Sequence, residues 1–348
     1  MNKIKDNYQV SIVIPCRNEE KFIGKCLDSV IAQDYPQKKL EVLVADGMSE
    51  DGTRKIVGEY CEKYPFIKLL DNPEKFTPFA MNIGIKNAKG DFIILMGAHA
   101  NYAKDYVSRC VAVMEKSGAD NVGGRVDILP IDNSMMARAI ALCLSSFFGA
   151  GNAHYKTSLP KKSVEVDTVF GGCYKKEVFD KIGLFDGRLI RNQDLEFNLR
   201  LKRAGGKIIL SPKIISYYYP KNSLRKFAGH NFADGFWVIY PLKFGLKTFS
   251  WRHLLPMVFV LGIFSLLLLG FWDRFFWIAL IAGLAFYILF NLIFSARIAI
   301  REKTPAVFFP VAAVFFVRHF FYGLGSLWAL LKVCFLSFYY DKQRGGKN

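Results

Sequence analysis

The sequence predicts an α/β domain followed by an α-helical membrane domain, and two observations carry this fold class. Short apolar segments alternate with amphipathic helical patterns through the first hundred residues. Two uncharged apolar segments, 254–272 and 275–296, follow in the last third, and each is long enough to cross a bilayer as a helix. We therefore expect a globular domain at 1–220 and a hydrophobic membrane domain at 253–340.

The alternation defines the elements of the globular domain. Strands are expected where short apolar runs occur, at 11–15, 40–45, 66–70 and 91–96. Helices are expected where apolar residues share one helical face, at 20–33, 53–63 and 78–87, and again at 176–182 and 194–204. Strands that alternate with helices indicate βαβ units and a parallel sheet covered on both faces.

Polar loops that contain glycine follow three of these strands. The first strand leads into 15–20, the second into 46–53, and the strand at 91–96 leads into 97–100. Ligands of open α/β sheets bind outside the carboxyl ends of the strands. We therefore expect the three loops to converge on one binding crevice.

Four stretches, in this order, resemble the motifs of family 2 glycosyltransferases with the GT-A fold, a Rossmann-like fold of nucleotide-diphospho-sugar transferases. They are "SIVIPCRNEE" (11–20), "VLVADGMSEDGT" (42–53), "AMNIGIKNAKGDFIILMGAHA" (80–100) and "GLFDGRLIRNQDLEFNLRLKRAGGKI" (183–208). The variants "DGMSEDGT" and "GAHA" look closest to the subfamily named for succinoglycan exopolysaccharide biosynthesis. The resemblance covers residues 8–220 and implies a nucleotide-sugar donor, with a UDP-linked sugar as the first expectation.

The resemblance assigns donor-binding residues to the first two loops. Asp46 is expected to accept a hydrogen bond from the nucleotide base, while Pro15, Arg17 and Glu19 line the other side of the nucleotide. An Asp after a strand also binds N–H groups of its own turn, but the motif context favours the binding role. Glu19 could equally be an acid that the helix dipole favours in a first turn.

Two more donor-side residues have structural alternatives of equal weight. Asp51 lies in the second loop, where Asp51 and Thr53 are both good helix caps. Asn82 matches an Asn that lies near the nucleotide in the family, and its alternative is a solvated helical Asn. The resemblance also counts Ala98 and Arg191 among the residues that contact the donor.

Asp194 is the expected catalytic residue. It matches the second acid of the family's Glu-Asp motif, which is the proposed general base for the acceptor hydroxyl. Asp194 belongs to the first turn of the expected helix, after Asn192 as a suitable cap, and the positive helix end favours an ionised carboxylate. Gln193 replaces the usual Glu, so the paired carboxylate is absent. The alternative role is that of an ordinary acid at a helix start.

The sequence departs from the family at its metal motif. The family has Asp-x-Asp, whose carboxylates bind a divalent metal, and this chain has Gly97-Ala98-His99. Imidazole suits manganese better than magnesium. We expect either that His99 holds the metal, Mn²⁺ in preference to Mg²⁺, with help from diphosphate oxygens, or that basic side chains such as Arg191 stabilise the diphosphate.

The membrane part contains a hairpin and a third hydrophobic region. Only Asp273 and Arg274 separate the two uncharged segments, so these segments should form a helical hairpin. The third region, 305–338, is interrupted by Arg318 and His319, and forms either one span with a buried Arg or a re-entrant or interfacial helical pair. The pair keeps the basic residues at 297–303 and in the tail 341–348 in the cytosol, as the positive-inside rule prefers. The linker 221–252 mixes Lys and Arg with aromatic residues, which is typical of helices in the headgroup layer.

Charge and cysteine usage limit the partners and the compartment. The formal net charge is +17, and no nucleic-acid module signature occurs, so we expect anionic lipids and not nucleic acid as partners. The seven cysteines form no Cys-x-x-Cys pair and indicate reduced cytosolic thiols. The N-terminus carries no signal-peptide pattern.

These expectations combine into one function. The chain should be an inverting transferase that moves a sugar from a nucleotide donor to a lipid-linked acceptor at the cytosolic face of the cytoplasmic membrane, in exopolysaccharide or other surface-glycan biosynthesis. One alternative adds the sugar to polyprenyl phosphate itself. Another is a catalytically inactive membrane protein that binds a sugar nucleotide, which the altered metal motif favours and the intact Asp194 disfavours.

Overall fold

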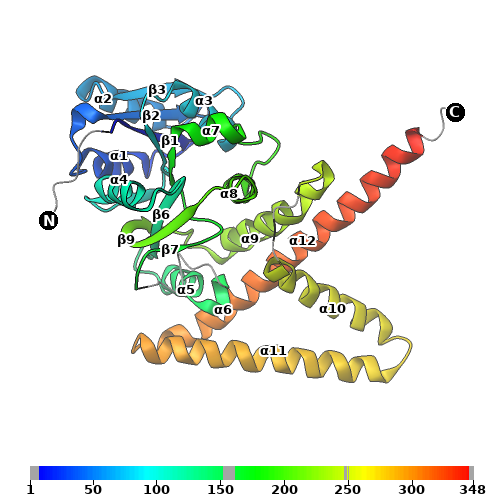
Figure 1. Ribbon diagram of the computed structural model, residues 1–348. Helices are drawn as coiled ribbons and strands as arrows, with labels where there is room; N and C mark the ends of the chain where they lie inside the picture. The colour runs from blue at the N-terminus through cyan, green and yellow to red at the C-terminus, as the bar shows by residue number, and fades with distance from the viewer. Residues whose placement is uncertain (1–7, 152–160, 247–248, 250, 345–348) are drawn as a thin grey trace. The chain divides into compact units, whose positions relative to one another are not determined.

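The computed structural model of the chain describes residues 8–151, 161–246, 249 and 251–344, and divides into two compact units (Figure 1). Unit 1 contains Met1–Asp127 and Ala153–Tyr219, and unit 2 contains Ile128–Asn152 and Pro220–Asn348. The second division falls where the sequence places the end of the globular domain. The segment 128–152 was expected in that domain, and the structure instead groups it with the C-terminal helices.

Unit 1 is built on a mixed sheet. Among the described residues the sheet has nine strands in the order β3-β2-β1-β4-β8-β6-β9-β5, with β7 paired to β9. The strands are β1 (Val10–Cys16), β2 (Leu40–Asp46), β3 (Ile67–Asp71), β4 (Phe92–Leu95), β5 (Ala100–Tyr102), β6 (Asn121–Ile128), β7 (Val164–Glu165), β8 (Cys173–Lys175) and β9 (Ile208–Tyr218). The first four pair in parallel, whereas β8 pairs antiparallel with both β4 and β6. The expectation of a parallel sheet holds only for this half, because the strand–helix alternation that demands parallel pairing stops after β4.

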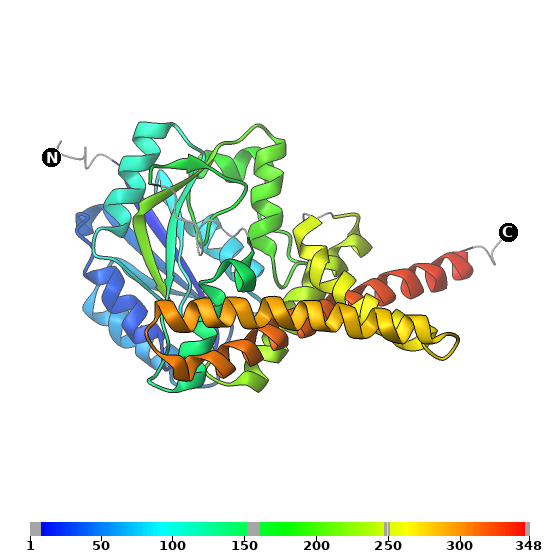
Figure 2. The ribbon, with the colours of Figure 1, turned by 90° about the horizontal axis from the view of Figure 1, so that it is seen from below.

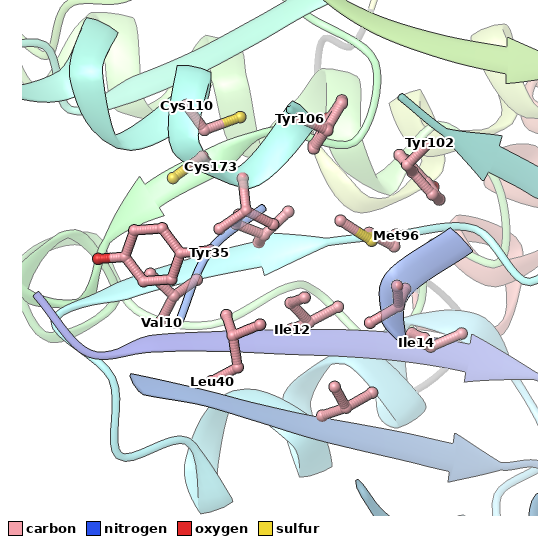
Figure 3. Close-up of a cluster of buried hydrophobic side chains, with 14 of the residues drawn as sticks. Val10, Ile12, Ile14, Tyr35, Leu40, Met96, Tyr102, Tyr106, Cys110 and Cys173 are labelled. Carbon is pink, nitrogen blue, oxygen red and sulfur yellow. The ribbon is translucent and has the colours of Figure 1, made fainter. Parts of the chain in front are cut away.

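Helices cover both faces of the sheet. They are α1 (Ile23–Ile31), α2 (Thr53–Lys63), α3 (Thr77–Asn87), α4 (Tyr106–Ser117), α7 (Lys176–Ile182) and α8 (Gln193–Arg203). Ile12 and Ile14 of β1 point into a core with α1, α2 and α4, which Figure 3 shows in part. Val13 points the other way, into a core with α3, α7 and α8. Successive side chains of β1 therefore point to opposite faces of the sheet, and each face has an apolar core, as a central strand requires.

The helix boundaries follow local signals closely. α2 and α7 begin and end at the expected residues, and α3 and α8 each begin one residue before the expected start. α1 begins three residues later than expected, because the carbonyl of Glu19 accepts hydrogen bonds from the N–H groups of Phe22 and Ile23 and forms a turn first. That turn leaves Glu19 in the loop and not in the helix.

Two glycines of the third motif have a packing role. A Cβ on Gly84 would lie 2.3 Å from a methyl of Val13, and a Cβ on Gly90 would lie 2.5 Å from the backbone nitrogen of Ser11. Both distances are far below van der Waals contact, so no larger residue fits without movement. The glycines bring α3 and the start of β4 close against β1.

Unit 2 is helical. Its helices are α5 (Met135–Leu144), α6 (Phe147–Ala150), α9 (Leu224–Ile239), α10 (Leu255–Leu269), α11 (Arg274–Arg301) and α12 (Phe308–Arg344), with short 3₁₀ turns at Tyr240–Phe244, Trp251–Leu254 and Pro305–Val307. The expected hairpin is present between α10 and α11, and both helices contact α12 (Figure 2). Asp273 begins α11 by accepting a hydrogen bond from the N–H of Phe275 at 2.7 Å.

The hydrophobic segments differ from expectation in two ways. Of the described helices, two are long and apolar enough to cross a membrane by length and composition, Arg274–Arg301 and Pro305–Phe335. The segment 254–272 contributes only the 15-residue α10, because a 3₁₀ turn occupies its start and a loop its end. Of the two arrangements left open for the third region, the structure has the unbroken one, a continuous helix through Arg318 and His319, and not the helical pair that the positive-inside rule favours. Other helices of the unit supply partners for both side chains, so the polar pair does not interrupt α12.

The linker 221–252 packs within unit 2. α9 lies along α12, with Val238 and Ile239 buried against Ala329. Lys332 of α12 lies over the ring of Phe236 at 5.8 Å from its centroid. One face of α9 is therefore committed to protein contact, and only its other face is open to solvent or lipid.

Candidate active site

The loops after β1 and β2 are joined by hydrogen bonds at the carboxyl edge of the parallel strands. The N–H of Asn18 donates to Ser49 Oγ at 2.8 Å, and the N–H of Glu50 donates back to Asn18 Oδ1 at 2.9 Å. The N–H of Glu19 donates to Thr53 Oγ1 at 2.7 Å. Asn18 has a φ of 53°, a left-handed conformation that Asn tolerates. The expected convergence of these two loops is confirmed.

The loop after β4 reaches the same place through His99. Its Nδ1 lies 3.3 Å from Glu19 Oε1, and its ring meets that of Tyr218 edge-on with centroids 5.6 Å apart. Ala98 is buried, whereas the position of a Cβ on Gly97 has no atom within 4 Å. The third loop therefore joins the first two, and it brings an imidazole and a carboxylate together in the position of the family's metal motif.

This donor set limits how a metal can be held. Among the described residues, no group of three or more His, Cys, Asp or Glu side chains could hold a metal ion. His99 and Glu19 offer one nitrogen and one carboxylate, and their side chains are 45% and 21% exposed. A nitrogen and an oxygen fit a transition ion such as Mn²⁺, but two ligands are too few to retain one. The pair fits an ion that arrives with oxygen ligands of its own.

Asp46 ends β2 and is fully buried. Its Oδ2 accepts hydrogen bonds from Arg54 Nη1 at 2.8 Å and from the N–H of Ser49 at 2.9 Å, and its Oδ1 accepts from Ser49 Oγ at 2.5 Å. Burial and the nearby Asp46 charge raise the pKa of the Cys16 thiol, which lies 3.7 Å from Oδ1 and stays protonated to donate to it. Asp46 thus binds groups of its own turn, which is the structural alternative to nucleotide binding. Its hydrogen bond to a nucleotide base stays a prediction.

The other donor-side residues of these loops differ in exposure. Arg17 is exposed, and its side chain lies against Gly47, while Pro15 is half-buried in β1 opposite Ala45. Asp51 accepts hydrogen bonds from the N–H and hydroxyl of Thr53 at 3.0 and 2.5 Å. Slight desolvation opposes ionisation of Asp51, but these hydrogen bonds outweigh it and lower its pKa. Asp51 therefore organises the turn into α2, although Gly52, and neither Asp51 nor Thr53, occupies the cap position.

Asn82 is not a solvated helical residue. Its amide nitrogen donates to the carbonyl of Phe185 at 2.8 Å, and its amide oxygen accepts from the N–H of the same residue at 3.0 Å. This two-point clamp holds the segment that precedes α8. Sequence reasoning missed the clamp because residues 82 and 185 are far apart along the chain.

Asp194 lies in the first turn of α8, as expected. Its Oδ1 accepts a hydrogen bond from the N–H of Leu195 at 2.9 Å, and Arg191 just before the helix is half-buried. Asn192 occupies the cap position, as expected, but with a φ of 58° it makes no side-chain cap hydrogen bond. Cap side chains usually reach the helix N–H groups from an extended backbone, which Asn192 does not have. The first turn of α8 instead carries two acids, Asp194 and Glu196, whose negative charge complements the positive end of the helix.

A buried polar network behind Asp194 was not expected from the sequence. Asn198, one turn further along α8, is fully buried and donates to Thr168 Oγ1 at 2.9 Å. Its Oδ1 accepts from Asn121 Nδ2 at 2.9 Å and from the Tyr174 hydroxyl at 3.1 Å. Burial, and secondarily the charge of Asp194, raises the pKa of Tyr174. This network fixes the start of α8 against β8 and β6.

β8 lies between α8, which it contacts through Tyr174, and β4, the strand that precedes the loop with His99. β8 pairs with β4, and the carbonyl of Gly172 accepts from the N–H of Leu95 at 2.9 Å. Gly171 has a φ of 64°, and a Cβ there would lie 2.6 Å from the carbonyl oxygen of Leu95. The two glycines therefore form a close turn beside the carboxyl end of β4.

A mixed sheet whose parallel half brings three polar loops to one edge, with an acidic helix start held against the neighbouring strand, is the architecture of a GT-A glycosyltransferase. The chain belongs to glycosyl transferase family 2, whose sequence model matches residues 11–183. It is a glycosyltransferase, and the resemblance found in its motifs is confirmed.

Two curated relatives and two solved structures are similar to the chain. A dolichyl N-acetyl-α-D-glucosaminyl phosphate 3-β-D-2,3-diacetamido-2,3-dideoxy-β-D-glucuronosyltransferase of Methanococcus voltae is 30% identical, over 93% of this chain and 97% of that protein. The succinoglycan biosynthesis protein ExoA of Rhizobium meliloti is 28% identical, over 75% and 83%. The mannosyltransferase PcManGT of Pyrobaculum calidifontis, solved with GDP-Man and Mn²⁺, covers 66% of this chain and 65% of its own at TM-score 0.50 and 22% identity. The S. aureus TarS 1–349 complex with UDP-GlcNAc covers 66% of each chain at TM-score 0.50 and 18% identity. The two structures support the fold.

Proposed function

We propose that this protein is an inverting glycosyltransferase that moves one sugar from a nucleotide-sugar donor, UDP-linked in the first instance, to a lipid-linked acceptor. The product is a precursor of an exopolysaccharide or another surface glycan. One observation carries the proposal. The polar loops after β1, β2 and β4 are joined at one edge through Asn18–Ser49 and Glu19–His99, where open α/β sheets bind their ligands.

The relatives support the acceptor class. The name of the Methanococcus voltae enzyme specifies a dolichyl-linked sugar phosphate, and the alignment with this chain spans nearly all of that protein. The Rhizobium meliloti protein is named for the biosynthesis of a polysaccharide. The long apolar helices of unit 2 suit an enzyme whose substrate carries a lipid.

Asp194 is the proposed general base. The acceptor hydroxyl oxygen attacks the anomeric carbon of the donor, Asp194 takes the hydroxyl proton, and the bond from that carbon to the diphosphate oxygen breaks. The nucleoside diphosphate leaves with the electron pair of this bond, so the configuration at the anomeric carbon inverts. Proton transfer to a positioned carboxylate contributes about 10²–10⁴ in rate.

The other site residues bind the donor in this proposal. Asp46, Pro15, Arg17 and Asp51 belong to the loops that would surround the nucleotide, and Asn82 acts on the same site by holding the segment before α8. Arg191 lies in the segment that leads to Asp194 and would face the diphosphate, whereas Ala98 is buried in the core beside His99 and would offer the donor only its backbone. Glu19 and His99 would hold Mn²⁺ in preference to Mg²⁺ only together with diphosphate oxygens, and the ion would offset the charge of the leaving group.

The proposed location is the cytoplasmic membrane, with unit 1 in the cytosol and more than one membrane crossing. Arg297, Arg301 and Lys303 follow the apolar part of α11, and the positive-inside rule favours the cytosolic side for such a cluster. Nucleotide sugars are cytosolic substrates, which agrees with this orientation. Anionic lipids would be attracted by the basic residues of unit 2.

A donor and acceptor screen tests the proposal. Full-length protein in detergent is supplied with a panel of UDP- and GDP-sugars and a polyisoprenyl-phosphate-linked sugar acceptor, and both nucleoside diphosphate release and glycolipid formation are measured. We expect transfer from one donor with inversion at the anomeric carbon. Asp194→Asn should lower turnover by about 10²–10⁴ with donor affinity unchanged.

Asp180→Asn is the matched control, because Asp180 is an exposed acid on α7. It should keep wild-type turnover. Donor binding without turnover of any donor would identify a catalytically inactive sugar-nucleotide-binding protein. Transfer to unmodified polyprenyl phosphate would show that the acceptor is the lipid phosphate itself and not a lipid-linked glycan.

A further inference from the structure

One positive charge lies within the helical packing of unit 2. Arg318 is in the middle of the apolar stretch Pro305–Phe335 of α12 and is partly buried. Its Nε–H donates to the carbonyl of Gly149 on α6, and its Nη1 donates to Asn231 Oδ1 on α9 at 2.8 Å. The guanidinium therefore lies where three helices meet.

The groups around Arg318 do not balance its charge. A backbone carbonyl and an amide oxygen are neutral, and no carboxylate of a described residue lies within the 4.0 Å of an ion pair with Arg318. A guanidinium has five N–H donors, and only the two on Nε and Nη1 have acceptors among the described residues. Acids are scarce here, since 221–348 contains 15 Lys and Arg against four Asp and Glu. A charge in apolar packing is costly unless it is paired, and is retained where it has a use.

The neighbouring His319 shows the contrast. Its Nε2 lies 2.8 Å from the carbonyl oxygen of Phe148, and its Nδ1 lies 3.0 Å from the hydroxyl of Tyr287. A carbonyl only accepts, so Nε2 carries a proton. Both nitrogens of the imidazole have partners, and the side chain needs no ligand. Arg318 has unused donors and an uncompensated charge.

The helix α9, which binds Arg318, has a charged outer face. Asn231 belongs to α9, and the outer face of that helix carries exposed Arg225 and Lys226 and a His230–Asp234 pair at 3.3 Å. Apolar contacts on one face and charges on the other are typical of helices in the interfacial layer. Arg318 is bonded to this helix through Asn231, so the guanidinium and the charged face of α9 belong to the same part of unit 2.

We propose that Arg318 binds the phosphate of an isoprenoid phosphate lipid, the anionic group of the lipid-linked acceptor. A phosphate supplies both the missing negative charge and oxygen acceptors for the free N–H groups, and the planar guanidinium matches two of its oxygens. The inference rests on the proposed function, and it names the group of the acceptor that unit 2 recognises. Gly149 and Asn231 orient the guanidinium from one side and leave the rest of the fork for the ligand.

The test uses the full-length protein in detergent micelles with geranylgeranyl phosphate as the probe and geranylgeraniol as the same chain without phosphate. Binding is followed by tryptophan fluorescence, because all five tryptophans lie between Trp237 and Trp328. Arg318→Gln should weaken probe binding at least tenfold, which corresponds to about 1.4 kcal/mol, and should leave geranylgeraniol binding unchanged. Arg301→Gln is the matched control, because it makes the same substitution at an exposed Arg. This variant should change probe affinity less than twofold.

Asn231→Asp separates binding from packing. It places a carboxylate beside Nη1, balances the charge inside the protein and keeps the contact between α9 and α12. The probe should bind at least tenfold more weakly to this variant as well. If Arg318 only joins α6 to α9, Asn231→Asp leaves probe affinity unchanged, and that result overturns the proposal. Equal competition by phosphatidylglycerol also overturns it, because the site would then recognise anionic lipid in general.

Failure of this inference is distinguishable from failure of the proposed function. If the wild-type protein transfers no sugar to any lipid-linked acceptor, the proposed function is wrong whatever Arg318 binds. If it transfers sugar and Arg318→Gln keeps the wild-type KM for the acceptor, the inference alone is wrong.

Discussion

Arg54 contacts two carboxylates of very different burial, and this difference yields a quantitative prediction. Asp46 has no exposed side-chain surface and Asp71 is 63% exposed, yet each lies 2.8 Å from a nitrogen of the same guanidinium. Asp46→Asn removes the charge from a buried partner, and hydrogen bonds to charged groups contribute about 1.5–3 kcal/mol each. We expect unit 1 to lose about 2–3 kcal/mol in its free energy of unfolding, because Arg54 keeps its second partner. Asp71→Asn should cost about 0–1 kcal/mol, as exposed ion pairs do.

The assay is thermal unfolding of the full-length protein followed by far-UV circular dichroism. Tryptophan fluorescence does not serve, because no tryptophan lies in unit 1. At about 2–4 °C per kcal/mol for a domain of this size, Asp46→Asn should lower Tm by about 4–12 °C and Asp71→Asn by about 4 °C at most. A loss for Asp71→Asn that equals or exceeds that for Asp46→Asn would refute the reasoning. Donor affinity of Asp46→Asn, measured by calorimetry, tests the proposed contact with the nucleotide base.

Three more predictions follow from particular contacts. His99→Ala should lower turnover and reduce the preference for Mn²⁺ over Mg²⁺, and full wild-type turnover in chelator would exclude a metal role. The folded protein lowers the pKa of Asp51 below its ordinary value of 3.8, so the ionised carboxylate stabilises the fold at pH values above 3.8, and this stabilisation is lost as the pH falls through the pKa of the folded state. Unfolding curves of Asp51→Asn and wild type should therefore differ at pH 7 and converge in acid. A difference that stays constant with pH would contradict the assignment. Gly84→Ala should destabilise unit 1 by about 1–3 kcal/mol through its clash with β1, whereas Gly58→Ala, which meets no atom within 4 Å, should be neutral or stabilising, and equal Tm values for the two variants would exclude the packing role.

The membrane unit shows where sequence patterns reach their limit. Hydropathy located α11 and the hairpin before it, because length and absence of charge are properties of a contiguous segment. It left the third region open between one span and a helical pair, since the sequence around Arg318 and His319 does not show whether the helix continues through them. Partners from α6, α9 and α11 satisfy both side chains, and these partners lie up to 171 residues away along the chain.

The sequence by itself determined the parallel half of the sheet, its helices and the loops that carry the family motifs. Apolar periodicity, glycines and caps act over a few residues, so α2 and α7 were predicted at their observed boundaries. It also indicated that Asp194 starts a helix and that His99 stands at the altered metal motif.

Only the tertiary structure decided which groups meet. It assigned 128–152 to the helical unit, paired Glu19 with His99, gave Asn82 a structural partner in Phe185, and surrounded Asp46 with its own turn. The physical reason is common to all four. A hydrogen bond or an ion pair depends on distances of about 3 Å between atoms, and such distances between segments remote in sequence are set by the packing of the whole domain.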